Sequence, residues 1–135
     1  MTLSGKYYIR TGVDVIDYEH DVILEEINSI IDHRCVAMYD PFGALSRIAI
    51  KVRAHFITEE RLMKMYLYPE TSAHVSRHDV FLRELRYLIE RLSNGGGLDV
   101  NERSRYLSRW MIGHIAMHDC PLGDYIRTHN ADIIT

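Results

Sequence analysis

The chain has 135 residues, of which 47% are hydrophobic, enough for one domain with a single buried core. Its net charge of −3 gives no attraction to nucleic acids or anionic membranes, so neither is expected as a partner. No apolar run approaches the ~18–20 residues that cross a bilayer, and the first residues lack the apolar centre of a secretory signal, so we expect a cytoplasmic protein without membrane insertion.

Cysteine and histidine usage narrows the kind of site to look for. The two cysteines, Cys35 and Cys120, form no CxxC pair, which argues against a disulfide scaffold or a zinc finger. The chain also contains 8 histidines, a high count for its length. Their positions therefore decide the functional argument.

The first half of the chain predicts an irregular arm followed by two helices. Residues 1–16 have no clear helical period. Apolar side chains then recur at steps of three and four over residues 17–39, with Asp17 as the expected N-cap. A turn containing Pro41 leads to a second helix over residues 41–65, because proline is favourable in the first turn of a helix.

The second half predicts two more helices. Tyr68-Pro69 interrupts the second periodic segment, and a third helix is expected over residues 70–92. The glycines of residues 95–97 are a strong helix stop. A fourth helix is expected over residues 101–119.

The chain end is expected to be less regular. Pro121 and Gly123 should disturb the end of the fourth helix, and residues 124–135 should form a short helix or a tail. Four periodic segments of ~20 residues with short connections predict one all-α domain over residues 1–135. The expected fold is an antiparallel up-down-up-down four-helix bundle with an irregular N-terminal arm.

Histidines and a carboxylate interrupt the apolar faces of these helices. The polar residues at core-facing positions are His20 in the first helix, His55 and Glu59 in the second, His74 and His78 in the third, and His114 in the fourth. Burying one unpaired polar group costs on the order of 1–3 kcal/mol, so six of them need a common partner. A metal is the natural one.

Their positions along the helices support a single site. In an up-down bundle, the starts of the first and third helices lie at the same end as the finishes of the second and fourth. All six residues fall near that end, within roughly 5–15 Å of it at ~1.5 Å of rise per residue. His55/Glu59 and His74/His78 are also i, i+4 pairs, which point two side chains the same way.

Asp119 joins this set only if the fourth helix is distorted. It follows His114 by five residues, which is ~140° around a regular helix. Pro121 has no backbone N–H and therefore weakens the turn around Met117. The sequence thus contains a cause for the required irregularity.

These residues resemble the pattern of the hemerythrin family. The resemblance rests on His55-Phe56-x-x-Glu59-Glu60, on Tyr68-Pro69 followed by His74-x-x-x-His78-x-x-Phe81, and on Trp110-x-x-x-His114-Ile115-x-x-x-Asp119. Thr11-Gly12-Val13 and Glu19-His20 are similar to the family's entry arm and first ligand. The likeness extends from about Tyr7 to Tyr125.

The resemblance implies two iron ions joined by an oxo or hydroxo bridge. One iron would be held by His74, His78 and His114, and the other by His20 and His55. Glu59 and Asp119 would bridge the two. This set fills all but one coordination position of two octahedral irons, and the open position, on the iron with two histidines, would bind O2.

The resemblance also implies a dry pocket around bound O2. The side chains expected to line it are Phe56, Phe81, Trp110, Met111 and Ile115. Two positions depart from the family's usual residues. Met111 stands where leucine is frequent, and Glu19 where glutamine is common.

Several alternatives remain open on the sequence alone. His118 lies four residues after His114 and could mimic a ligand pair, but a role outside the ligand set is favoured because the family uses the Asp119 position. Cys120 is expected to be an inert thiol. Zinc is disfavoured, because seven ligands exceed a four-coordinate zinc site.

The expected function is reversible O2 binding for carriage, storage or delivery. The alternative is an input domain that senses O2, NO or redox state and is fused to, or interacts with, a signalling output domain. An enzyme is not expected, because no second acid or base is evident near the pocket.

Overall fold

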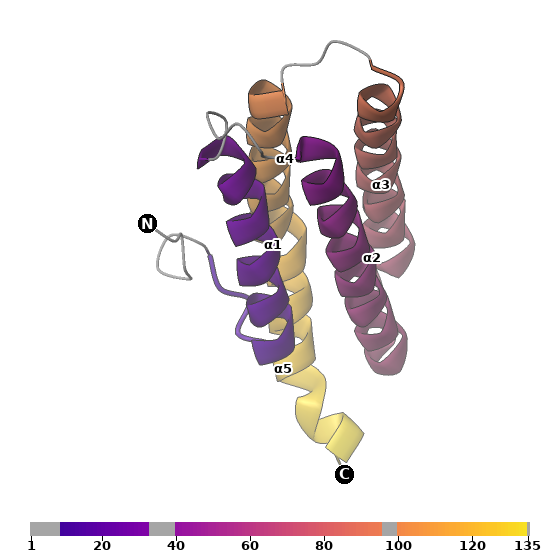
Figure 1. The fold of residues 1–135 in the computed structure, drawn as a ribbon. Helices are drawn as coiled ribbons and strands as arrows, with labels where there is room; N and C mark the ends of the chain where they lie inside the picture. The colour runs from indigo at the N-terminus through magenta and orange to yellow at the C-terminus, as the bar shows by residue number, and fades with distance from the viewer. Residues whose placement is uncertain (1–8, 33–39, 96–99, 135) are drawn as a thin grey trace.

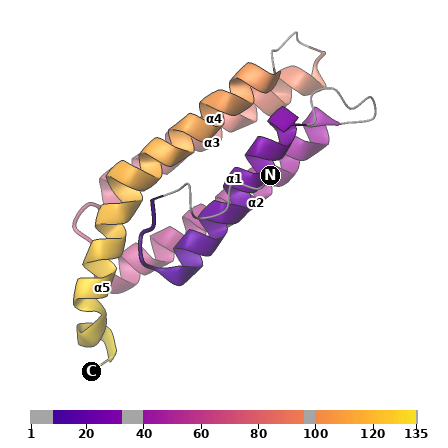
Figure 2. The ribbon, with the colours of Figure 1, turned by 90° about the vertical axis from the view of Figure 1, so that its left-hand side faces the viewer.

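The computed structural model describes residues 9–32, 40–95 and 100–134, and all regular structure in these ranges is helical. The helices are α1 (Asp14–Asp32), α2 (Pro41–Tyr66), α3 (Thr71–Ser93), α4 (Val100–His114), the π-helix η2 (Ile115–Asp119) and α5 (Cys120–Ile134). Figures 1 and 2 show α4 running into α5 as one long rod. The four rods run alternately up and down, which confirms the predicted four-helix bundle.

The helices do not approach one another equally closely. The backbones of α1 and α2, of α2 and α3, and of α1 and α4 are close neighbours, whereas α3 and α4 approach each other less closely. Among the described helices, none combines the length and apolar character that crossing a membrane requires.

Two apolar clusters flank a polar layer. The larger contains Leu24, Ile48 and Phe81 with twelve other buried residues, and the smaller is formed by Ile16, Met63, Leu122 and Ile126. Along α1, α2 and the α4–α5 rod, buried histidines or carboxylates separate residues of one cluster from those of the other. The apolar layers hold the helices together on either side of the site.

The start of α1 corrects one sequence expectation. The helix begins at Asp14, and Asp17 is not its N-cap, because the Asp17 N–H already donates to the Val13 carbonyl. The Asp17 carboxylate instead accepts hydrogen bonds from Thr11 N, Thr11 Oγ1 and Gly12 N, at 2.9, 2.8 and 3.1 Å. Asp17 therefore fastens the preceding arm. The expected continuation of this helix over 33–39 lies outside the described residues.

The predicted limits of α2 and α3 and the predicted start of α4 differ from the observed ones by at most one residue. α2 ends at Tyr66, where Leu67 adopts a left-handed conformation (φ 54°) before Tyr68-Pro69. The chain end differs more, because α5 continues as a helix from Cys120 to Ile134. Pro121 lies in its first turn, where a missing N–H is tolerated. Leu122 and Ile126 supply the buried face that stabilises this extension.

Candidate metal centre

All seven predicted ligand residues meet in two overlapping groups. Glu59, His74, His78, His114 and Asp119 form one group, and His20, His55, Glu59 and Asp119 form the other. Within each group, the potential ligand atoms lie within 4.8 Å of one another. Every residue of both groups is buried.

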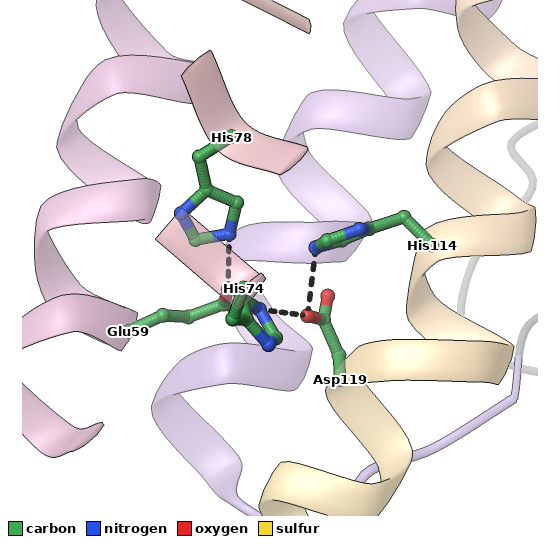
Figure 3. Close-up of side chains that lie close together, drawn as sticks. All are labelled: Glu59, His74, His78, His114 and Asp119. Carbon is green, nitrogen blue, oxygen red and sulfur yellow. Dashed lines mark hydrogen bonds and ion pairs between the residues drawn. The ribbon is translucent and has the colours of Figure 1, made fainter. Parts of the chain in front are cut away.

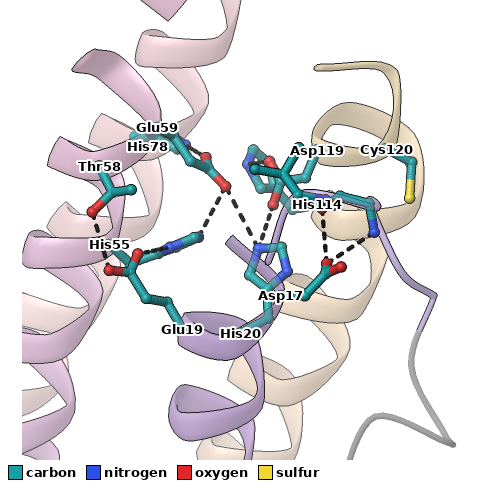
Figure 4. A network of polar contacts seen from close by, with 12 residues as sticks. Asp17, Glu19, His20, His55, Thr58, Glu59, His78, His114, Asp119 and Cys120 are labelled. Carbon is teal, nitrogen blue, oxygen red and sulfur yellow. Dashed lines mark hydrogen bonds and ion pairs between the residues drawn. The ribbon is translucent and has the colours of Figure 1, made fainter. Parts of the chain in front are cut away.

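Each helix of the bundle contributes to this centre. α1 supplies His20, α2 supplies His55 and Glu59, α3 supplies His74 and His78, α4 supplies His114, and η2 supplies Asp119. Figure 3 shows the first group with its side chains directed toward one another from α2, α3 and the α4–η2 segment. Figure 4 shows His20 and His55 approaching Glu59 and Asp119.

Glu59 divides its two oxygens between the groups. Oε2 lies 2.9 Å from His55 Nε2 and 3.5 Å from His20 Nε2. Oε1 lies 3.1 Å from His74 Nε2 and 3.0 Å from His78 Nε2. One oxygen of this carboxylate thus faces each set of histidines.

Asp119 also presents one carboxylate oxygen to each group of histidines. Oδ2 lies 2.8 Å from His20 Nε2. Oδ1 lies 3.0 Å from His74 Nε2 and 3.1 Å from His114 Nε2. Two carboxylates that each span the same two groups of imidazoles suit a pair of adjacent cations.

Many polar atoms of the centre lack hydrogen-bond partners although they are buried. They are both ring nitrogens of His20 and His114, Nε2 of His55, Oε2 of Glu59 and both carboxylate oxygens of Asp119. These atoms are close in space but not aligned for mutual hydrogen bonds. Leaving so many buried polar atoms unsatisfied is costly, whereas metal coordination would satisfy the inward-facing ones. The donor set of imidazoles and carboxylates fits transition-metal ions such as iron.

Two further carboxylates orient the histidines from outside. His55 donates from Nδ1 to Glu19 Oε1 at 2.7 Å, and Glu19 Oε2 accepts a hydrogen bond from Thr58 at 3.1 Å. His78 donates from Nδ1 to Glu60 Oε2 at 2.9 Å. A proton fixed on Nδ1 leaves the Nε2 lone pair free to bind a metal.

Sequence reasoning did not assign these two supporting roles. From the sequence, Glu19 was only a departure from the family's usual residue and Glu60 only part of a motif, and no contact was predicted for either. The available signal was that each carboxylate adjoins a predicted ligand, Glu19 beside His20 and Glu60 beside Glu59. Each supports a histidine on a neighbouring helix, which only the packing reveals.

The carboxylates also change the acidity of the histidines. Burial lowers the pKa of His55, but the charge of Glu59 and the hydrogen bond to Glu19 outweigh it and raise this pKa to about 10. Burial also lowers the pKa of His74, but contacts with Asp119 and Glu59 outweigh it and raise this pKa to about 9. At His114 burial prevails and the pKa is lowered. In the absence of metal, protons on His55 and His74 balance the buried carboxylates.

The three aromatic residues predicted to line an O2 pocket contact the histidines of the centre directly or through one another. Phe56 stacks on the ring of His78 with centroids 3.7 Å apart, and Trp110 stacks on His114 at 4.8 Å. Phe81 contacts both Phe56 and Trp110. Phe56, Phe81, Met111 and Ile115 are buried, while Trp110 is partly exposed. The two stacking rings lie on the side of the three-histidine group.

The two residues left open by the sequence lie outside the groups that could hold a metal. The ring of His118 is 5.3 Å from that of His114 and is partly exposed. Cys120 is a free thiol whose Sγ donates to the Arg10 carbonyl at 3.6 Å, and burial raises its pKa. Neither residue belongs to the ligand groups formed by the described residues.

Comparisons with known proteins agree with this centre. The family model described as "Hemerythrin HHE cation binding domain" matches residues 11–119. A bacteriohemerythrin of Stenotrophomonas maltophilia is 31% identical over 123 residues, which cover 90% of this chain and 79% of that protein.

Bacteriohemerythrins of Pseudomonas aeruginosa and Pseudomonas paraeruginosa are each 28% identical over 132 residues, covering 93% of this chain and 82% of theirs. No solved structure matches the chain with significance. The family match, over residues 11–119, spans α1, α2, α3, α4, η2 and every residue of the buried centre. The chain therefore belongs to the hemerythrin family.

Proposed function

We propose that this protein binds O2 reversibly at a non-haem di-iron centre. His74, His78 and His114 would hold one iron and His20 and His55 the other, with Glu59 and Asp119 bridging them. The observation that carries the proposal is the division of both carboxylates, each of which presents one oxygen to each group of histidines. Two irons held in this way would supply the electrons for reversible O2 binding.

The surroundings of the centre favour binding over catalysis. The seven residues are between 0% and 4% exposed, so bulk water is kept from the site. Five of them are imidazoles, which keep the negative charge low compared with a carboxylate-rich site. The stacked rings of Phe56 and Trp110 restrict rotation of His78 and His114. We therefore favour carriage, storage or delivery of O2 over turnover of a substrate, in the cytoplasm.

The orienting carboxylates have a defined part in this proposal. Glu19 and Glu60 hold the Nδ1 protons of His55 and His78, one histidine for each iron. This fixes the tautomer and increases the basicity of Nε2 toward the metal.

The decisive experiment measures iron content and the visible spectrum of the purified protein. The protein is reduced without air, exposed to O2, and returned to an O2-free atmosphere. We expect two irons per chain and a colour that appears with O2 and fades on its removal. A matched Glu59→Ala variant should lose both iron and colour, whereas Glu25→Ala, at an exposed position of α1, should keep both. Absence of stoichiometric iron after reconstitution would refute the di-iron proposal.

A further inference from the structure

A surface cavity of about 390 Å³ lies where α3 and α4 approach less closely. Arg77 and Val80 of α3 form one side, Arg109, Trp110 and Gly113 of α4 form the other, and Met117 of η2 closes one end. We call it the Arg77–Trp110 cavity. It is outside the group of seven buried residues and touches that group only through His114.

The charge of this cavity is uncompensated. Arg77 and Arg109 are both exposed, and neither forms an ion pair with a residue in the described ranges. The cavity lining contains no carboxylate. Two guanidinium groups at one cavity, in a chain of net charge −3, form a local site for an anion.

Apart from the two histidines His114 and His118, the remaining lining is apolar and partly solvent-exposed. Val80 is 40% exposed and Met117 is 71% exposed, and Trp110 of the same lining is partly exposed. An aromatic ring and a thioether offer a surface on which a planar or aliphatic group can pack. The lining therefore suits an anion that carries an apolar body, rather than a bare inorganic ion.

Gly113 keeps the cavity open. It lies inside α4, where glycine costs roughly 1 kcal/mol relative to alanine. A Cβ built at this position would meet nothing within 4 Å, so packing within the protein does not require glycine here. The space above it is the cavity itself.

We propose that the Arg77–Trp110 cavity binds a small organic anion. Its carboxylate or phosphate group pairs with Arg77 and Arg109, and its apolar body lies against Trp110 over Gly113. This site lies outside the seven-residue centre, with which it shares only His114, and it requires no metal for the ion pairs that hold the anion.

A second cavity, also lined by residues of α3 and α4, provides a matched control. It also measures about 390 Å³ and is lined by Arg83 and Arg103, again one arginine from each helix. It differs in containing Glu84, whose carboxylate accepts a hydrogen bond from Tyr106 and supplies the negative charge that the first cavity lacks. Removal of either arginine pair changes the net charge equally, so only a site-specific effect distinguishes them.

The test is calorimetric titration of the metal-loaded full chain with phenyl phosphate and with benzoate. We expect saturable binding with a dissociation constant on the order of 1 mM, the range for ligands of this size. The double change Arg77→Gln/Arg109→Gln should weaken binding at least tenfold, and Arg83→Gln/Arg103→Gln should leave it within about twofold. Gly113→Leu, which fills the cavity with a better helix former, should abolish binding.

Several outcomes would overturn the proposal. One is absence of saturable binding of both probes up to about 20 mM, well above the expected constant. Equal binding of benzyl alcohol would show that the negative charge is irrelevant. Equal binding of inorganic phosphate would show that the apolar body is irrelevant. Binding unchanged by the Arg77/Arg109 and Gly113 variants would place the anion elsewhere, including on the metal. Iron content and the O2-dependent spectrum are measured separately on each variant, so loss of the O2 site is distinguished from loss of the anion site.

Discussion

Oδ1 of Asp119 lies 3.1 Å from Nε2 of His114, although the two residues are five positions apart in one continuous rod. In a regular α-helix they would be about 140° apart around the axis. The π-helix removes this difference, because the Cys120 N–H bonds to the Ile115 carbonyl, five residues earlier. Pro121 follows directly and has no N–H with which to restore the α-helical pattern. One rod therefore supplies two neighbouring ligands.

This geometry separates His114 from His118, which a regular helix would place on the same face. We expect His114→Gln to reduce bound iron from two per chain to one or none, because Nε2 faces Asp119 inside the centre. His118→Gln should retain both irons, because His118 lies outside the group. Metal analysis of the two purified variants provides the measurement. Equal iron loss in both would assign His118 to the ligand set and contradict the proposed centre.

Glu19 should control how firmly iron is retained at His55. Glu19→Ala removes the acceptor of the His55 Nδ1 proton, and loss of such a partner lowers metal affinity by roughly 10–100-fold. The expected result is faster transfer of iron to an external chelator. Glu19→Gln keeps a carbonyl acceptor and should have a smaller effect, and Glu25→Ala on the same helix serves as the control. A Glu19→Ala variant that releases iron at the wild-type rate would rule out this role.

The metal-free protein should lose stability as the pH rises. Burial lowers the pKa values of His55 and His74, but contacts with carboxylates outweigh this effect. The pKa of His55 is raised to about 10 and that of His74 to about 9, above the ordinary value of 6.5. Their stabilising contribution is complete below the unfolded value and is lost as the pH rises through the folded values. The urea midpoint of the metal-free protein should therefore fall between pH 6.5 and about pH 10.

The metal-loaded protein provides the comparison for that experiment. Its histidines bind as neutral imidazoles, so its urea midpoint should change little over the same interval. Identical pH profiles with and without metal would contradict the assignment of protons to His55 and His74 in the metal-free centre.

Two glycines of the α4–α5 rod should respond oppositely to a single methyl group. A Cβ at Gly123 would overlap the Thr11 carbonyl oxygen and lie 2.9 Å from Thr11 Cβ, whereas a Cβ at Gly113 meets nothing. Gly123→Ala should destabilise the fold, because a steric cost of about 1–3 kcal/mol exceeds the gain in helix propensity. Gly113→Ala should stabilise it by about 1 kcal/mol. Urea unfolding followed by circular dichroism measures both, and changes of the same sign would contradict the packing of Thr11 on α5.

The periodicity of the apolar residues was sufficient to predict the bundle and the limits of α2 and α3. It was also sufficient to predict that the histidines at core-facing positions lie near one end of the bundle, because a side chain's level in an up-down bundle follows from its distance along the helix. Two local expectations were less accurate. Asp17 has the residue type of an N-cap but fastens the arm instead, and Pro121 was expected to disturb a helix that in fact continues. In both cases contacts with distant residues outweighed local preference.

The sequence by itself determined the fold class and the composition of the buried centre, because helical periodicity and residue spacing are local properties of the chain. Only the tertiary structure decided which oxygen of Glu59 and Asp119 faces which histidines, and that Glu19 and Glu60 support His55 and His78. The arginine-lined cavity above Gly113 also appeared only there. These relationships depend on how far apart neighbouring helices pack and how they are rotated about their axes, and spacing within one helix does not specify either.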